Sequence, residues 1–216
     1  MLLEKHIDHT LLKPVATPEA IKQLCDEALE YNFYAVCVNS CYVALAREEL
    51  KDSGIKIAAV VGFPLGAMST EAKVCEAKYC IEQGADEIDM VMNLGLLKFG
   101  EFDLVKEEIA LIKKAIGSGI LKVIIETCYL TTEEKKIASM LVVEGKADFV
   151  KTSTGFGSGG ATFDDIELIG SVIQNKIKIK ASGGIKDKKT ALRYLDMGVS
   201  RLGTSSGIAI VKETNP

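Results

Sequence analysis

Short runs of β-branched and apolar residues alternate along the chain with longer amphipathic stretches. The short runs are typical of buried strands, and the stretches with apolar positions three and four apart are typical of helices. The predicted strands cover residues 6–10, 33–38, 56–61, 87–92, 121–126, 148–151, 177–180 and 199–203. The predicted helices cover residues 18–30, 42–51, 69–83, 102–115, 132–144, 163–173 and 188–197.

The alternation continues from end to end without a linker or a low-complexity segment. It leaves two architectures, a closed eight-stranded barrel and an open doubly wound sheet. Eight strand–helix units, the last ending in a short tail, favour the barrel. We therefore predict an α/β protein with a single (β/α)8 TIM barrel, formed by one domain over residues 1–216.

The composition narrows the classes of function. The net charge of −4, from 26 basic and 30 acidic residues, has the wrong sign for a nucleic-acid-binding chain. No apolar stretch reaches the ~20 residues of a membrane span, and no apolar signal segment opens the chain. The six cysteines form no Cys-x-x-Cys pair, which predicts reduced thiols and a cytoplasmic protein. Because His6 and His9 are the only histidines, a zinc site of imidazole and thiolate ligands is not expected. We predict no metal and no cofactor.

Strand alternation places charged side chains on one face of several strands. That face holds Glu87 and Asp89 on the fourth strand, and Lys178 and Lys180 on the seventh. The other faces are aliphatic and would pack under helices, so the charged faces point into the barrel. Because an unpaired buried charge is costly, acids of the fourth and fifth strands should pair with lysines of the fifth to seventh. We predict that Lys178 pairs with Asp89 or Glu126.

Four charged residues end their strands at the barrel mouth, where active sites of this fold are built. They are Asp89, Glu126, Lys151 and Lys180. A second ammonium nearby disfavours the charged form of a lysine, and a neutral lysine can condense with a carbonyl to an imine. Asp89 would then relay protons. For either lysine taken alone, a salt bridge is the simpler interpretation.

Glycine-rich loops follow the last three predicted strands, at residues 152–160, 181–185 and 203–207. Glycine lets the backbone approach a ligand, and hydroxyl and N–H donors suit an anion. Phosphate sites of this fold typically follow the seventh and eighth strands. We therefore predict a phosphorylated small molecule as the partner.

Two other classes of function remain open. Residues 155–160 match the dinucleotide-binding pattern Gly-x-Gly-x-x-Gly, which is also typical of a nicotinamide-dependent oxidoreductase. The following strand ends Lys180-Ala181-Ser182-Gly183, without the acidic residue that would hold the ribose, which weakens that interpretation. A non-catalytic phosphate-binding protein would need the glycine loops but not Lys151.

Six motifs resemble those of the deoxyribose-phosphate aldolase family, and together they span the chain from the first strand to the last. They are IDHTLL at 7–12, EIDMVMN at 87–93, KVIIETCYL at 122–130, DFVKTSTGF at 148–156, KASGGI at 180–185 and RLGTSSG at 201–207. The resemblance implies a metal-free class I aldolase. It would cleave 2-deoxy-D-ribose 5-phosphate reversibly to acetaldehyde and D-glyceraldehyde 3-phosphate, in deoxyribonucleoside breakdown.

The resemblance also implies residue roles. The Schiff-base lysine of the family falls on Lys151, the lysine that perturbs it on Lys180, and the proton-relay aspartate on Asp89. Asp8 and Cys37 match positions that line the substrate pocket. The phosphate contacts fall on Gly155, Gly183, Gly184, Gly203, Ser205 and Ser206.

The chain departs from the family pattern at two places. Some members carry a lysine where this chain has Phe156, and Lys186 is a candidate to replace that charge. Some members carry a C-terminal tyrosine that reaches the active site, which the segment 212–216 lacks. Enzymes of this class are often oligomers, so we expect a homo-oligomer, a dimer or a tetramer.

Overall fold

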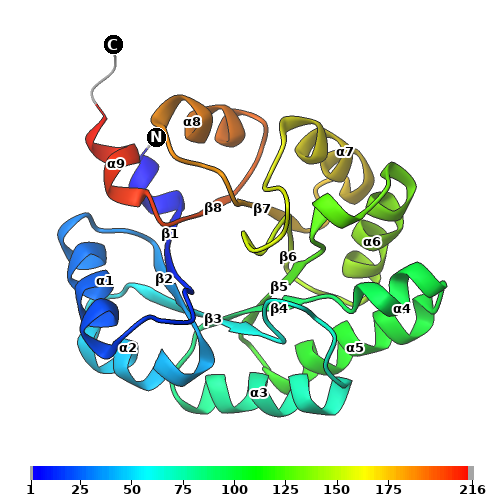
Figure 1. Ribbon diagram of the computed structural model, residues 1–216, viewed down its shortest axis with the longest axis horizontal. Helices are drawn as coiled ribbons and strands as arrows, with labels where there is room; N and C mark the ends of the chain where they lie inside the picture. Colours follow the sequence, from blue (N-terminus) through cyan, green and yellow to red (C-terminus); the bar gives the residue numbers. More distant parts are fainter. Residues whose placement is uncertain (1, 214–216) are drawn as a thin grey trace.

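A closed barrel of eight parallel strands forms the centre of the computed structural model, which describes residues 2–213. Each strand pairs with its neighbours in sequence, and the last pairs with the first. Figure 1 shows these strands as an inner ring with the helices outside it. They are β1 (Ile7–Leu11), β2 (Ala35–Val38), β3 (Lys56–Val61), β4 (Glu87–Val91), β5 (Ile120–Ile124), β6 (Phe149–Lys151), β7 (Lys178–Ser182) and β8 (Arg201–Thr204). The predicted TIM barrel is therefore confirmed, and the open sheet is excluded.

Seven helices coincide with the predicted ones to within two residues at either end. They are α1 (Pro18–Glu30), α2 (Val43–Glu49), α3 (Thr70–Glu82), α5 (Phe102–Ala115), α6 (Thr132–Glu144), α7 (Phe163–Ile173) and α8 (Lys188–Asp196). Their starts are set by side-chain caps: the Thr17 hydroxyl accepts from the Ala20 N–H, and Thr131 and Glu134 form a reciprocal capping box. Among the described residues, no helix is long and apolar enough to cross a membrane.

Short helices were not predicted. They are α4 (Leu94–Phe99), α9 (Gly207–Lys212) and the 3-10 turns η1 (Leu3–His6), η2 (Ser40–Tyr42) and η3 (Thr127–Tyr129). Segments of this length span too few turns to show a helical period. The predicted tail after the last strand is thus corrected in part, because α9 packs against β1 and η1. Residues 214–216, which contain part of the segment without tyrosine, lie outside the described residues.

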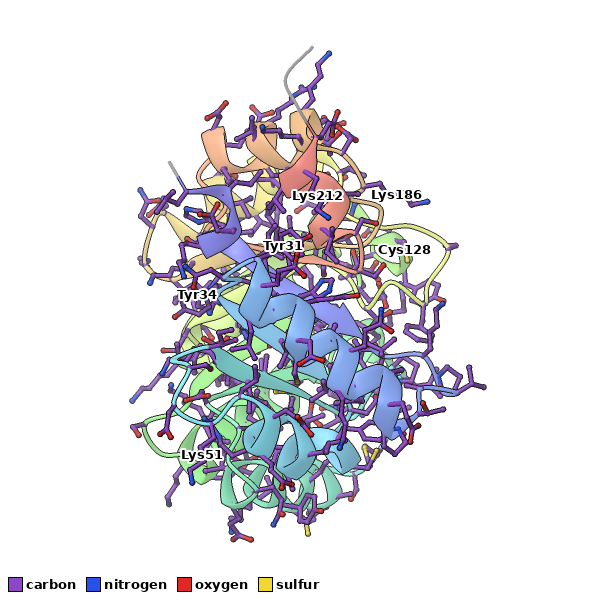
Figure 2. The ribbon with its side chains drawn as sticks, turned by 90° about the vertical axis from the view of Figure 1, so that its left-hand side faces the viewer. Tyr31, Tyr34, Lys51, Cys128, Lys186 and Lys212 are labelled. Atoms are coloured by element: carbon purple, nitrogen blue, oxygen red, sulfur yellow. The ribbon has the colours of Figure 1, made fainter. Side chains whose placement is uncertain are left out.

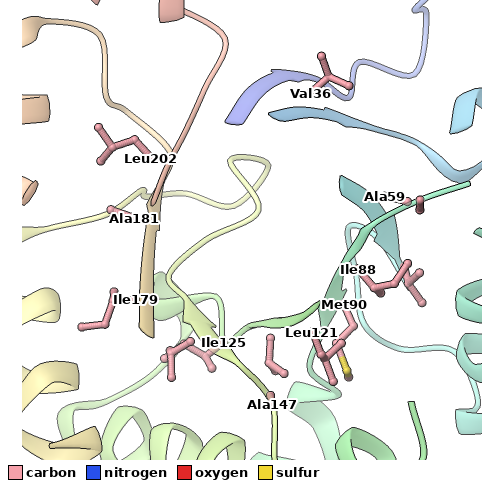
Figure 3. Packing of buried hydrophobic residues seen from close by; sticks show 14 of the residues in the cluster. Val36, Ala59, Ile88, Met90, Leu121, Ile125, Ala147, Ile179, Ala181 and Leu202 are labelled. Atoms are coloured by element: carbon pink, nitrogen blue, oxygen red, sulfur yellow. The ribbon is translucent and has the colours of Figure 1, made fainter. Parts of the chain in front are cut away.

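The main hydrophobic core lies between the barrel and its helices. Alternate strand residues such as Ile88, Met90, Leu121 and Leu202 are fully buried there, and Figure 3 shows their side chains directed outward from the strands. Full burial of such a side chain contributes ~1.5–3 kcal/mol. The aliphatic faces therefore hold the helices in place and leave the other faces to line the barrel interior.

Candidate active site

A cavity of about 220 Å³ opens at the carboxyl ends of the strands. Lys151 lines it and is only 3% exposed. The glycine loops contribute most of the wall, and all six predicted phosphate contacts line it: Gly155, Gly183, Gly184, Gly203, Ser205 and Ser206. The structure therefore brings the predicted nucleophile and the predicted anion-binding loops to one cavity.

Asp89 joins the two predicted lysines. Its Oδ2 atom lies 2.8 Å from Lys151 Nζ and 2.8 Å from Lys180 Nζ. Asp89 and Lys180 are fully buried and do not line the cavity. Lys151 thus reaches the cavity, whereas its two partners lie beside it within the barrel.

Asp89 and Lys180 also belong to a closed ring of six alternating charges, which we call the charged ring: Asp89, Lys122, Glu87, Arg201, Asp8 and Lys180. Lys122 Nζ lies 2.5 Å from Asp89 Oδ1 and 2.6 Å from Glu87 Oε2. Arg201 bonds Glu87 through one nitrogen and lies 2.5 Å from Asp8 Oδ1 through the other. Lys180 Nζ closes the ring at 2.5 Å from Asp8 Oδ2. The predicted pairing of acids with lysines inside the barrel is confirmed for Glu87 and Asp89 of the fourth strand. It is wrong for the fifth-strand acid Glu126, whose carboxylate bonds Thr154 instead.

Strand register explains how the charged ring forms. Asp89 is in register with Lys122, Lys151 with Lys180, and Lys180 with Arg201. Gly203 supplies the space for Lys180, because a Cβ at Gly203 would lie 3.0 Å from Lys180 Cε and 2.9 Å from Ser182 Cβ. Strand register, alternation along the strands and the absence of a side chain at Gly203 therefore all contribute to assembling the network.

The two lysines at Asp89 differ in their pKa values. Burial lowers the pKa of Lys151 below its ordinary value; Asp89 opposes this shift and the Lys180 ammonium adds to it. Burial also disfavours the charge of Lys180, but Asp8 and Asp89 outweigh it and raise its pKa. Lys151 is therefore the lysine that more readily becomes a free amine.

Two carboxylates of the charged ring, Asp89 and Asp8, are held ionised. Burial opposes the charge of Asp89, yet Lys122, Lys151 and Lys180 hold its pKa well below the ordinary value. The pKa of Asp8 is also lowered, because Lys180 and Arg201 overcome the effect of burial. Both groups are consequently carboxylates that accept hydrogen bonds at neutral pH.

The glycine loops need glycine at specific points. Gly183 and Gly184 have φ values of +85° and +82°, which strain any residue with a Cβ. Gly160 packs directly on Gly183, so that a Cβ at Gly160 would collide with the Gly183 carbonyl. The loops after β6 and β7 are therefore pressed together at the cavity.

Glu126 has a different place from the one predicted. It is buried and does not line the cavity. Its carboxylate accepts from the Thr154 backbone N–H, at 3.2 and 3.3 Å, and from the Thr154 hydroxyl. Because Thr154 lines the cavity, Glu126 anchors the loop after β6.

Asp8 and Cys37 are both fully buried, and neither lines the cavity. Asp8 is part of the charged ring. Cys37 packs with Leu12, Ala58 and Val60 in a small apolar cluster, and burial raises the pKa of its thiol. Their predicted contact with substrate stays a prediction.

Phe156 and Lys186 both line the cavity. Phe156 is half exposed and meets Phe63 edge to face, with ring centroids 5.3 Å apart. Lys186 is exposed, and Figure 2 shows it at the outer edge of the molecule, on the same side as Cys128. One wall is thus aromatic, and a cation lies at the rim.

The prediction for Lys178 is wrong. Lys178 is exposed and lines a hollow with Tyr34 and Phe149, and its Nζ lies 5.8 Å from the Phe149 ring centroid. In Figure 2, Tyr34 lies on the side of the molecule opposite Lys186. Lys178 begins β7, so it sits at the amino end of the barrel, and its side chain faces this hollow rather than Asp89 or Glu126.

Arg201 was quoted within a motif, but its contribution to the interior charge was missed. It lies two residues before Gly203 and therefore shares its face of β8. Its guanidinium carbon lies 3.3 Å from the Tyr34 ring. The strand-alternation argument used for the fourth and seventh strands would have found it.

Among residues 2–213, no group of three or more His, Cys, Asp or Glu side chains could hold a metal ion. Residues 155–160, which match the dinucleotide-binding pattern, form a loop that begins at the cavity wall with Gly155 and Phe156. Ala161 and Thr162 separate this loop from the start of α7. The groups that the structure does gather are an amine of lowered pKa, an ammonium and a carboxylate.

A (β/α)8 barrel with such groups at the carboxyl end of its strands defines a barrel enzyme suited to carbonyl chemistry. The sequence matches the DeoC/LacD aldolase family over residues 3–214, and the chain belongs to that family. It is therefore an aldolase, a carbon–carbon lyase, as the motif resemblance implied.

Individual relatives agree. The chain is 53% identical to the deoxyribose-phosphate aldolase of Finegoldia magna, over 98% of this chain and 100% of that protein. It is 54% identical to that of Thermococcus gammatolerans, over 98% and 96%. The tetrameric deoxyribose phosphate aldolase from Aeropyrum pernix has a similar structure, with a TM-score of 0.89 and 31% identity over 97% of this chain and 89% of that one.

Proposed function

We propose that this aldolase cleaves 2-deoxy-D-ribose 5-phosphate reversibly to acetaldehyde and D-glyceraldehyde 3-phosphate, through a Schiff base on Lys151. The observation that carries the proposal is Lys151 itself, a buried amine of lowered pKa at the base of a cavity walled by glycine loops. The substrate is that named for relatives of more than half identity. No cofactor is required by this chemistry.

In the proposed reaction, neutral Lys151 Nζ attacks C1 of the open-chain sugar, and the carbinolamine loses water to give an iminium. A base removes the proton of the C3 hydroxyl, the C2–C3 bond breaks, and its electron pair moves into the iminium to form an enamine. The three-carbon aldehyde leaves. Protonation of the enamine at C2 and hydrolysis then release acetaldehyde and regenerate Lys151.

Asp89 and Lys180 would manage the protons. Lys180 is held as an ammonium and shares Asp89 Oδ2 with Lys151. It is the proton donor, and Asp89 is the acceptor through which a proton passes to the reacting atoms. Asp8 would orient Lys180 through their 2.5 Å ion pair, and Cys37 would shape the apolar side of the site.

The phosphate would bind where the glycine loops meet. Gly155, Gly183, Gly184 and Gly203 allow close backbone approach, Ser205 and Ser206 offer hydroxyls, and exposed Lys186 offers a charge at the rim. We further propose that residues 1–216 form one catalytic domain, and that the chain is a cytoplasmic homo-oligomer acting in deoxyribonucleoside breakdown.

An acetaldehyde-release assay tests the substrate. We expect release from 2-deoxyribose 5-phosphate, far less from unphosphorylated 2-deoxyribose, and none from sugar phosphates with a 2-hydroxyl group, which cannot yield acetaldehyde on C2–C3 cleavage. Lys151→Leu should abolish release, whereas Lys178→Leu, at the opposite end of the barrel, should retain it. Activity on another sugar phosphate alone would overturn the substrate, and retained activity in Lys151→Leu would overturn the mechanism.

A further inference from the structure

The charged ring is balanced without Lys151. It contains three carboxylates, Asp8, Glu87 and Asp89, and three cations, Lys122, Lys180 and Arg201, each in contact with at least two of opposite sign. Every member is 5% exposed or less. When all six are ionised, the charged ring itself carries no net charge.

Lys151 is a seventh ionisable group beside the ring, and it is the only one of the seven that lines the cavity. A proton on Lys151 would add a positive charge beside a ring whose own charges are already balanced, at the cost that burial imposes on such a charge. The balance therefore depends on every ring member, including those that do not contact Lys151.

Glu87 and Arg201 are the members farthest from the chemistry. Neither is within ion-pair distance of Lys151, and neither lines the cavity. Arg201 instead lines the hollow at the amino end of the barrel, where it stacks on Tyr34. Glu87 opens β4, in register with Ile120 at the start of β5.

We propose that Glu87 and Arg201 are a positioning pair that keeps Lys151 as a free amine by balancing the charge of the barrel interior from its far end. This inference rests on the proposed function only in assigning the reacting amine to Lys151. The pair touches no reacting atom and acts through the charged ring.

The other groups that face Lys151 leave this count unchanged. Asp89 on β4 and Lys180 on β7, which act on Lys151 directly, and Lys122 and Asp8, which pair with them, are ring members already counted. Glu126, which follows β5, is buried and bonds Thr154; it lies outside the ring and is the same in every variant compared. Cys37 on β2 is a neutral thiol, because burial raises its pKa. The remaining cations at the cavity, Lys13 and Lys186, are exposed at the rim, where solvent screens them.

The pair has a signature that a merely structural role would not produce. Arg201→Met leaves the ring one negative charge in surplus, so Lys151 holds its proton more tightly and the acid limb of kcat/KM moves to higher pH. Glu87→Gln leaves one positive charge in surplus, so that limb moves to lower pH. Each shift is expected to be about one pH unit, and the double variant should return the limb to the wild-type position.

The experiment measures kcat/KM for 2-deoxyribose 5-phosphate from pH 4 to 9 for the wild type, both single variants and the double variant. Arg201→Lys keeps the charge and should leave the limb in place. Shifts in the same direction, no shift, or no restoration in the double variant would overturn the proposal. If Arg201→Met does not fold, the direction of the Glu87→Gln shift decides alone. Failure of the proposed function would differ, because then even the wild type would release no acetaldehyde.

Discussion

Lysines 151 and 180 share one carboxylate oxygen but have opposite pKa shifts. The difference lies in their other neighbours. Lys180 also contacts Asp8 at 2.5 Å, so two carboxylates stabilise its charge. Lys151 has Asp89 as its only ion-pair partner among the described residues and lies beside the Lys180 ammonium. Within the proposed mechanism, the contact of Asp8 with Lys180 and not with Lys151 therefore makes Lys180 the proton donor and Lys151 the nucleophile.

Ser205 tests the proposed phosphate site. It is exposed at the wall of the cavity, away from the charged ring. Ser205→Ala removes one hydroxyl donor to a charged group, a loss of about 1.5–3 kcal/mol. We expect KM for the phosphorylated sugar to rise roughly tenfold or more while kcat changes little. Steady-state kinetics would show this.

Ser171→Ala is the matched control for Ser205→Ala. Ser171 is exposed on α7 and bonds only the Leu168 carbonyl within that helix, so its loss should leave both constants unchanged. A Ser205→Ala enzyme with wild-type KM, or with an equal increase in KM for unphosphorylated 2-deoxyribose, would place the phosphate elsewhere.

At the scale of elements, a buried ion pair joins α3 to α5. Lys73 Nζ lies 2.9 Å from Glu108 Oε1 and donates to the Val91 carbonyl, also at 2.9 Å. Both side chains are fully buried, and the Lys73 stem fills the space above Gly62. The pair thus ties two helices to the ends of β3 and β4.

Removing one partner of this ion pair should lower the free energy of unfolding more than replacing both partners by apolar residues. Lys73→Met leaves the Glu108 carboxylate buried without a cation, and we expect the free energy of unfolding to fall by about 3–5 kcal/mol. The double variant with Glu108→Leu should recover most of that loss. Urea unfolding measures both, with Lys78→Met on the exposed face of α3 as the control.

A loss in the double variant as large as in Lys73→Met would contradict this account of the pair. It would mean that Lys73 stabilises the fold through its hydrogen bond to the Val91 carbonyl rather than by neutralising the buried Glu108 carboxylate. Lys78→Met should change the free energy of unfolding by no more than about 0.5 kcal/mol.

Sequence patterns predicted the long elements because their information is local. The bounds of α1, α5, α6 and α7 followed from helical period and from caps such as Thr17 and Thr131. Lys178 was misplaced because alternation gives the face of a residue but not its height along the barrel. Lys73 was not singled out, because a helical lysine is ordinarily exposed and its partner lies on another helix.

The candidate site was predictable to the same degree. Strand ends and glycine loops located Lys151, Lys180 and the cavity wall. The closure of the charged ring through Arg201 and Glu87 could not be predicted, because it depends on the stagger between strands, which only the assembled barrel fixes. For the same reason, the sequence did not show that Asp8 lies within the charged ring rather than at the cavity.

For the whole molecule, the charged ring links stability to pH. The pKa values of Asp8 and Asp89 are lowered in the folded state, so their contribution is present above the unfolded value of about 3.9 and is lost as pH falls through the folded values. Those of Lys122 and Lys180 are raised, so their contribution is present below the unfolded value of about 10.4 and is lost above it, as pH rises through the folded values.

Acid unfolding should therefore depend on Asp8. Between pH 4 and 2, each such carboxylate contributes up to about 1.4 kcal/mol per pH unit to the slope of the free energy of unfolding. We expect Asp8→Asn to reduce this slope by about one proton, and Asp26→Asn, on the exposed face of α1, to leave it unchanged. An unchanged slope in Asp8→Asn would show that the ring does not couple stability to pH as described.

Identifying the lysine that forms the imine is the most direct test of the central claim. The enzyme is incubated with acetaldehyde and borohydride, digested, and analysed by mass spectrometry of its peptides. The account predicts an ethyl group on Lys151 in the wild type and no site-specific label in Lys151→Leu. A label on Lys180, or no label at the cavity, would contradict it.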